Sequence, residues 1–277
     1  MSHDFHFASE VVDVTAHDLP GRKAAFIVGR VPDGSIVLDV GCGGGKVLRT
    51  ISEHRRGVTL LGCDVAEPTY IDGDFTFTAL DGSTGLLPYE DASVDVALLV
   101  DVLEHVEHPE TTLNEIARIL RPNGTMLAFV PIEGERVSWY SAFRALLGQD
   151  LYVRTKGHIN SFTHDRIERM LTARFVIDER RFLYHFLGQL MDAALCAALT
   201  IGPVRRAFWT HSPYHGESNE ARPPSVLGRV VAATFTAANV AAWIESRLLR
   251  NVRAMSAGML LAAHRREPGA SPETTAD

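Results

Sequence analysis

Four aspartates recur beside short apolar runs in the first part of the chain. They are Asp39, Asp64, Asp81 and Asp101. Each lies within or directly after a run typical of a buried strand, at 36–40, 58–63, 75–80 and 94–100. The carboxyl ends of parallel strands meet at one edge of a sheet, where ligands bind, so we expect the four side chains to share that edge. One such aspartate alone is most simply a helix cap or a solvated loop residue. Four beside a glycine-rich loop predict a cofactor site.

The glycine-rich loop reads VLDVGCGGGK from residue 37 to residue 46. It fails as a phosphate-binding G-x-x-x-x-G-K-[ST] loop, because Val47 occupies the hydroxyl position. It also fails as the dinucleotide fingerprint G-x-G-x-x-G, because Lys46 stands where the third glycine is needed. The pattern that remains is G-x-G-x-G, formed by Gly41, Gly43 and Gly45. Glycines let a backbone approach a ligand closely, and the N-terminus of the next helix can receive a carboxylate.

Strand-like and helix-like segments alternate along the chain, which predicts βαβ units and an α/β fold with a doubly wound, mostly parallel sheet. Helical patterns occur at 21–30, 46–53 and 111–120, and another helix is expected to begin near Thr163. Further strands at 125–130, 175–178 and 259–263 bring the total to seven. We expect a single domain over residues 1–266, with a helical insertion at 182–253 before the last strand. The tail 267–277 is expected to be disordered.

The composition is that of a globular protein, with 46% hydrophobic and 22% charged residues. Its three cysteines are far apart in sequence, which argues against a disulfide framework and a cysteine-based zinc site. The formal charge of −7 argues against a nucleic-acid binder, which needs a basic face. No basic region followed by an apolar run opens the sequence, so a cytoplasmic protein is expected.

Arginines are concentrated in the last third of the chain. Residues 180–266 carry 11 arginines, no lysine and four acids, a balance of +7 that leaves −14 for the rest of the chain. Such a basic block indicates an anionic partner, or arginines that simply face water or the acidic body of the protein.

The insertion is expected to contain two amphipathic helices with broad apolar faces. In the first, over 183–199, the polar side is formed by His185, Gln189, Asp192 and Cys196. In the second, the polar side is formed by Ser225, Arg229, Thr236 and Asn239. The longest charge-free run, 230–244, is too short to span a bilayer. The apolar faces must therefore pack on the body, on a second subunit as in a homodimer, or peripherally on an anionic membrane.

Four segments carry a resemblance to a known family: VLDVGCGGG, GCDVAE, ALDGS and SVDVALLVDVLEHVEHPETTLNEIARILRPNGTMLAFVP. They resemble the class I S-adenosylmethionine-dependent methyltransferases, most of all the small-molecule group called methyltransferase type 11. The resemblance covers Val37 to Pro131, is weaker from Lys156 to Asp178, and is absent as a motif after Phe182. It implies a Rossmann-like seven-stranded sheet, S-adenosyl-L-methionine as cofactor and S-adenosyl-L-homocysteine as product.

The resemblance further implies a role for the glycine loop and the second strand. Asp64 would accept hydrogen bonds from both ribose hydroxyls, a task suited to an ionised carboxylate. The residues that would surround the methionine moiety are Asp39, Gly41, Cys42, Gly43 and Gly45.

The same resemblance assigns the adenine and sulfonium ends of the cofactor. Val65 would lie against the adenine face, and Asp81, with the backbone at Gly82, would accept from the adenine amino group. Asp101 and Val102 would border the sulfonium, where Leu103-Glu104-His105 is expected to open the next helix.

The catalytic candidates are histidines. His158 precedes the helix after strand five, where this family commonly lines its acceptor pocket, and a neutral imidazole there could take a proton from a hydroxyl. A loop histidine bonded to backbone is the alternative. His105 is a weaker candidate. Glu104-His105-x-x-His108 is not expected to bind a metal, and the His211/His215 pair is expected to be solvated.

The sequence favours methyl transfer from S-adenosylmethionine to a small-molecule or lipid-linked acceptor, with O-methylation preferred. Asp101-Val102-Leu103-Glu104 differs from the N/D-P-P-Y/F motif of enzymes that methylate nucleobase amines, so nucleic acid is not the expected acceptor. The alternative is a catalytically inactive S-adenosylmethionine-binding protein that acts as a partner or regulator. The aromatic residues Trp139, Tyr140, Phe143 and Tyr152 either line the acceptor pocket or pack in the ordinary way.

Overall fold

The computed structural model describes residues 13–68, 71, 73–147, 156–202 and 226–266. Tyr152, the His211/His215 pair, Ser225 and the tail 267–277 lie outside the described residues, as do the side chains of 226–235, Arg229 among them.

Seven strands form one sheet in the order β3-β2-β1-β4-β5-β7-β6, in which only β7 runs antiparallel to its neighbours. This confirms the predicted doubly wound, mostly parallel sheet. The strands are β1 (Ile36–Val40), β2 (Thr59–Asp64), β3 (Thr76–Ala79), β4 (Val94–Val100), β5 (Leu120–Pro131), β6 (Phe175–Leu183) and β7 (Gly258–Arg265).

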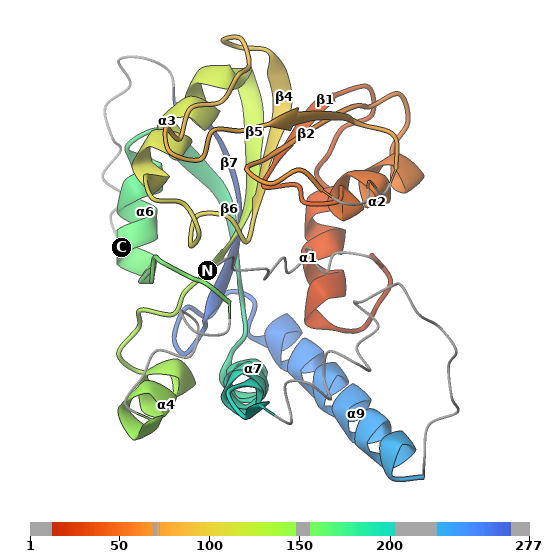
Figure 1. The fold of residues 1–277 in the computed structure, drawn as a ribbon, viewed down its shortest axis with the longest axis vertical. Helices are drawn as coiled ribbons and strands as arrows, with labels where there is room; N and C mark the ends of the chain where they lie inside the picture. The colour runs from red at the N-terminus through yellow and green to blue at the C-terminus, as the bar shows by residue number, and fades with distance from the viewer. Residues whose placement is uncertain (1–12, 69–70, 72, 148–155, 203–225, 267–277) are drawn as a thin grey trace.

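Helices cover both faces of this sheet (Figure 1). On one face lie α1 (Leu19–Val28) and α2 (Lys46–His54), and on the other lie α3 (Pro109–Ile119) and α6 (His164–Thr172). The strands between them are buried on both sides, so Leu98 of β4 packs into one core cluster while its neighbour Leu99 packs into the other. This two-sided burial is why the strands read as continuous apolar runs in the sequence.

Two strands are longer than the sequence predicts. β6 continues through Leu183, because it is an edge strand in which half-buried charged residues, such as Glu179 and Arg181, alternate with exposed ones. That alternation interrupts the apolar pattern, so the insertion begins later than residue 182. β5 begins at Leu120 rather than 125, since residues 121–124 form a bulge in its pairing with β4.

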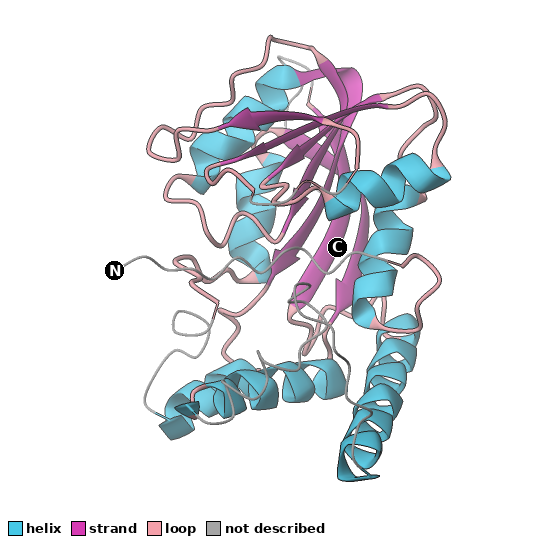
Figure 2. Cartoon of the chain, turned by 45° about the vertical axis from the view of Figure 1, so that its right-hand side comes forward, coloured by secondary structure: helices cyan, strands magenta, loops and turns pink. Residues whose placement is uncertain are grey.

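Three further helices lie beyond one end of the sheet: α4 (Trp139–Leu147), α7 (Phe186–Leu199) and α9 (Val226–Leu248) (Figures 1 and 2). Both β5 and β6 run antiparallel to β7, so β6 ends at the same edge as the parallel strands. Because α7 follows β6 and α9 precedes β7, these two helices lie at the carboxyl edge of the sheet. No helix among the described residues is long and apolar enough to cross a membrane.

The polar side of α7, rather than its apolar side, faces the body. His185, Gln189 and Cys196 are each at most 1% exposed. Gln189 holds the helix in place, because its Oε1 accepts from the Trp139 amide at 2.8 Å and its Nε2 donates to the Met255 carbonyl at 2.7 Å. On the apolar side, Phe186 and Leu187 at the start of the helix are exposed, whereas Met191 packs against the core.

Candidate active site

The glycine loop ties the end of β1 to the end of β2. The Gly41 and Cys42 amides donate to the Cys63 carbonyl at 2.7 and 3.1 Å, and the Gly43 amide donates to Asp64 Oδ2 at 2.9 Å. Gly41 has a φ of +75°, and a Cβ there would lie 2.8 Å from Val102 Cγ2. Only glycine allows this turn and this close approach.

The predicted cofactor residues lie next to one another along the carboxyl edge. The Val102 side chain lies where a Cβ of residue 41 would clash with it, and the Asp64 carboxylate accepts from the Gly43 amide. On the far side of Asp64, Val65 is 64% exposed and its Cγ1 lies 2.8 Å from where a Gly82 Cβ would be. These contacts form a continuous line from the end of β4 past β1 and β2 to the loop after β3.

Asp39 is buried at 2% exposure beneath the glycine loop. Burial, and then the nearby Asp64, raise the pKa of Asp39 to about 8. A positive charge above the loop would reverse this shift, because it would favour the carboxylate over the neutral acid. The loop is thus better suited to a ligand with a cationic group than to an anion alone.

Asp101 directly follows β4 and lies in the left-handed region, with a φ of +54°. Such a conformation is rare outside glycine and is concentrated at functional sites. Its Oδ2 lies 2.7 Å from Nζ of Lys23, which is 6% exposed and also lies 4.2 Å from the centroid of the Phe129 ring. Sequence reasoning missed Lys23, since a single lysine on an amphipathic helix gives no signal of a partner 78 positions away.

Asp81 has a different local role from the other three aspartates. Its Oδ1 accepts from the amide and hydroxyl of Ser83 at 3.0 and 2.7 Å, and these bonds lower the pKa of Asp81. The side chain is exposed and shapes a turn after β3, next to Gly82.

A second cluster lies beside Asp101 and contains Glu104, His105, His158 and Glu133. Glu104 is 1% exposed, and within the described part of the chain neither of its carboxyl oxygens has a hydrogen-bond partner. Burial, and then Asp101, raise its pKa well above the usual range. One ligand-type atom from each of Glu104, His105 and His158 lies within 4.8 Å of the others. These three side chains can therefore share a proton or hold a cation.

The chain segment before α6 brings His158 to this cluster. The amides of Ile159 and Asn160 both donate to the Glu104 carbonyl at 2.9 Å. His158 is 6% exposed, and its Nδ1 lies 2.8 Å from Glu133 Oε1, so it bonds a carboxylate rather than backbone at that nitrogen. With Nδ1–H donating to Glu133, the proton-accepting nitrogen is Nε2.

His105 stands beside His158, with ring centroids 4.8 Å apart at 86°. Burial, and then His158, lower the pKa of His105, which favours a neutral ring. The expectation that Leu103-Glu104-His105 opens a helix is wrong. These residues form a turn, and α3 begins at Pro109 because proline suits the first helical position. His108 precedes that helix and is exposed.

Polar groups from three segments meet under the insertion. The Tyr140 hydroxyl of α4 donates to Asp192 Oδ2 at 2.9 Å, and Lys156 Nζ lies 3.0 Å from Asp192 Oδ1. Although burial opposes its charge, the Asp192 carboxylate raises the pKa of Lys156. Tyr140 also packs with Cys196 in a small core cluster, so at least this aromatic residue builds the helical layer itself.

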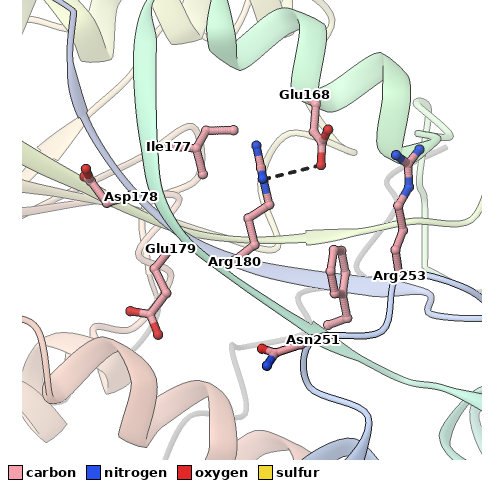
Figure 3. Close-up of a pocket in the computed structure, with 8 residues that line it drawn as sticks. Glu168, Ile177, Asp178, Glu179, Arg180, Asn251 and Arg253 are labelled. Atoms are coloured by element: carbon pink, nitrogen blue, oxygen red, sulfur yellow. Dashed lines mark ion pairs between the residues drawn. The ribbon is translucent and has the colours of Figure 1, made fainter. Parts of the chain in front are cut away.

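A separate hollow of about 390 Å³ lies against β6 (Figure 3). Arg180 crosses it toward Glu168 of α6, with 3.5 Å between Nε and Oε1. None of the residues predicted for the cofactor or for catalysis lines this hollow.

S-adenosylmethionine fits the carboxyl edge in four respects. Around Gly43, no atom of the described residues lies within 4 Å of where a Cβ would be, so its backbone is open to a ligand. Asp64 is half-buried at the tip of β2, and its carboxylate is suited to accept from ribose hydroxyls. The buried Asp39 carboxyl is suited to an ammonium group, and the exposed Val65 offers an apolar surface for adenine.

Residues 38–128 match a family model described as a methyltransferase domain. The chain is 34% identical over 103 residues to a ubiquinone biosynthesis O-methyltransferase of Maricaulis maris, which covers 34% of this chain and 40% of that protein. It is 31% identical over 163 residues to a tRNA (carboxymethyluridine(34)-5-O)-methyltransferase of Mus musculus, covering 57% of this chain and 23% of that protein. The matches thus span less than half of each of these relatives.

A Haemonchus contortus N-methyltransferase, solved in complex with phosphomonomethylethanolamine and S-adenosylhomocysteine, shares the fold. It has a TM-score of 0.54 at 17% identity, covering 89% of this chain and 53% of that one. At this identity the likeness concerns the fold alone. The sheet order and the glycine loop agree with the match of residues 38–128 to a methyltransferase domain, and the fold is that of the class I S-adenosylmethionine-dependent methyltransferases.

Proposed function

We propose that this protein transfers a methyl group from S-adenosylmethionine to a hydroxyl of a small-molecule or lipid-linked acceptor. The observation that carries the proposal is the His158–Glu133 pair beside Asp101, where the resemblance to the family locates the sulfonium. S-adenosylmethionine supplies an activated methyl group. The protein's own task is to hold donor and acceptor in line and to remove a proton, and positioning alone can contribute about 7–11 kcal/mol.

In this proposal His158 is the general base. Glu133 holds its Nδ1 proton, and Nε2 takes the proton of the acceptor hydroxyl as the methyl group is transferred. The neighbouring His105 is kept neutral by burial and by His158, so it does not add a second positive charge beside the imidazolium. A base of this kind is worth about 10²–10⁴-fold for a hydroxyl acceptor.

The helices between β6 and β7 act as an acceptor cap in this proposal. They lie at the carboxyl edge, and Asp192 of α7 reaches the Lys156 ammonium that precedes His158 by two residues. The cap thereby connects to the segment that carries the proposed base.

Substitution of Asp64 by alanine weakens the binding of S-adenosyl-L-homocysteine about ten- to a hundredfold. The reason is the loss of a charged acceptor for the ribose hydroxyls, worth about 1.5–3 kcal/mol. Isothermal titration calorimetry measures the change. Asp33, an exposed aspartate in the turn before β1, provides the matched control, and Asp33→Ala retains wild-type affinity. Equal affinities in the two variants would remove Asp64 from the cofactor site.

Binding of S-adenosyl-L-homocysteine at pH 7 releases close to one proton. The pKa of Asp39 is raised to about 8, so its carboxyl is protonated in the free protein at pH 7. The ligand's ammonium charge favours the carboxylate, and Asp39 therefore loses its proton when the ligand binds. By the same linkage, the free energy of unfolding of the free protein falls as the pH rises from about 4 to 8, because the native state binds this proton more tightly.

Calorimetry in phosphate and in Tris measures the proton release, since the two buffers differ in ionisation enthalpy. The apparent binding enthalpy differs between the buffers for the wild type and agrees for Asp39→Asn. Identical enthalpies for the wild type in both buffers would contradict the assignment.

The experiment that tests the function is incubation of the protein with methyl-labelled S-adenosylmethionine and three acceptor pools: fractionated metabolites, lipid extract and tRNA. The proposal expects label in a metabolite or lipid fraction, with no loss when a chelator is added. Label in tRNA would overturn the acceptor class. Binding of S-adenosylhomocysteine without transfer to any pool would favour an inactive binding partner, and chelator-sensitive transfer restored by Mg²⁺ would assign Glu104, His105 and His158 to a metal.

A further inference from the structure

The outward side of the two insertion helices carries exposed apolar side chains. They are Phe186 (48% exposed) and Leu187 (38%) on α7, and Ile244 (46%) and Leu248 (78%) on α9. We name this set the apolar cap face. Large apolar residues of a helix are normally buried, and a concentration of them on a surface marks an interaction site.

The apolar cap face is continuous across the two helices. The amides of Leu187 and Gly188 donate to the Glu245 carboxylate, at 2.9 Å for the shorter Leu187 contact. Ile244 and Leu248 flank Glu245 one helical turn apart, so they lie on one side of α9 close to the N-terminus of α7. Glu245 is thus engaged by that N-terminus.

A cluster of four arginines borders the apolar cap face: Arg22, Arg181, Arg247 and Arg250. The Phe182 amide donates to the Arg250 carbonyl at 2.8 Å, which brings the end of β6 against the end of α9. Arg181 donates to Asn251 Oδ1 at 3.2 Å in the same junction. Arg247 lies over the Trp243 ring, 5.2 Å from its centroid, one turn before Arg250.

The arginine cluster carries excess positive charge. Nη1 of Arg22 is buried and has no hydrogen-bond partner among the residues that the structure describes. Burial, followed by Arg247, Arg250 and Arg181, lowers the pKa of Arg22 to about 10. The carboxylate nearest in sequence to Arg181 is Glu179, which pairs with Arg181 at 2.6 Å and also with Arg30. One carboxylate therefore serves two arginines, and the exposed side chains of Arg247 and Arg250 offer their positive charge to an external anion.

We propose that the apolar cap face and the arginine cluster together dock the protein on an anionic phospholipid surface. The apolar side chains enter the headgroup region, and the arginines bind lipid phosphates through charge-assisted hydrogen bonds. Charge complementarity favours this occupant over a second copy of the chain, because a two-fold dimer on this face would bring two arginine clusters toward each other. Docking itself is independent of methyl transfer. Docking would also deliver a lipid-linked acceptor to the carboxyl edge, and this second step rests on the proposed function.

The test is co-sedimentation of the full chain with vesicles of phosphatidylcholine alone and of phosphatidylcholine mixed with phosphatidylglycerol. Binding is expected to rise with phosphatidylglycerol and to fall as salt is added. The double variant Arg247→Gln/Arg250→Gln weakens binding about 25-fold, at about fivefold for each arginine near the surface. Leu248→Ser also weakens it. Two matched controls, Arg56→Gln on the exposed loop after α2 and Val176→Ser on β6, leave binding unchanged.

Three results would overturn the proposal. Equal binding to both vesicle types would remove the role of the arginine cluster. Binding of inorganic phosphate that depends on Arg247 and Arg250, with no vesicle binding at low salt, would make the cluster a site for a free anion. Dimerisation abolished by Leu248→Ser, again without vesicle binding, would assign the face to a second copy. Titration of each variant with S-adenosyl-L-homocysteine separates these results from failure of the proposed function, since docking variants keep wild-type cofactor affinity.

Discussion

Replacement of His158 by alanine lowers the turnover number about 10²–10⁴-fold, measured with the identified acceptor. The affinity for S-adenosyl-L-homocysteine changes little. The imidazole is buried and bonded to Glu133, so its proton-accepting nitrogen is fixed in tautomer and orientation. Removing it deletes the proposed base and leaves the proposed cofactor residues along the other strands intact. Steady-state kinetics combined with calorimetry measure both quantities.

Two further variants make this expectation specific. Glu133→Gln keeps the imidazole in place but removes the carboxylate that holds its proton, so the pH profile of turnover shifts while cofactor affinity is retained. His108→Ala changes an exposed histidine at the start of α3 and leaves turnover at the wild-type level. Wild-type turnover in His158→Ala, with the melting temperature unchanged, would exclude His158 as base and direct attention to His105.

Replacement of Lys23 by methionine lowers the free energy of unfolding by about 3 kcal/mol. Methionine preserves most of the packing against Phe129 but leaves Asp101, and the buried Glu104 behind it, without the positive charge of Lys23. Because Asp101 is about a third exposed, we place the effect at the lower end of the range for a broken buried pair. Urea unfolding of the two proteins measures the difference.

Arg49→Met is the matched control. Arg49 pairs with Glu53 at 2.9 Å on an exposed helix surface, where such a pair is worth less than about 0.5 kcal/mol. If Lys23→Met proves as mild as Arg49→Met, the Lys23–Asp101 pair does not hold the end of β4.

The placement of the proposed cofactor residues along one edge of the sheet was largely predictable from the sequence. Strands buried on both faces give continuous apolar runs, and parallel strands deliver their carboxyl ends to one edge whatever the details of packing. The line from Val102 past Gly41 and Asp64 to Val65 follows from that topology. Asp81 was a partial exception to this prediction. Its carboxylate accepts from Ser83 two residues away, and strand topology does not predict such a local hydrogen bond.

The proposed catalytic cluster was only partly predictable, because its members are joined by contacts between distant segments. His158 could be placed near the acceptor pocket, but Glu133 lies 25 positions away and gave no signal as its partner. Glu104 was read as the start of a helix, since only the docking of residues 159 and 160 on its carbonyl defines the turn that buries it. The sequence also did not determine which side of α7 faces the body, because that depends on contacts with segments distant in sequence. Gln189 finds specific backbone partners in the body, which favours burial of the polar side.

The central claim is that the carboxyl edge of this sheet binds S-adenosylmethionine. Its most direct test is calorimetric titration of the full chain with S-adenosyl-L-homocysteine and, separately, with NAD⁺. We expect one molecule of S-adenosyl-L-homocysteine to bind per chain and NAD⁺ to give no binding heat, since the loop has Lys46 where a dinucleotide fingerprint needs glycine. Tighter binding of NAD⁺ than of S-adenosyl-L-homocysteine would contradict the claim.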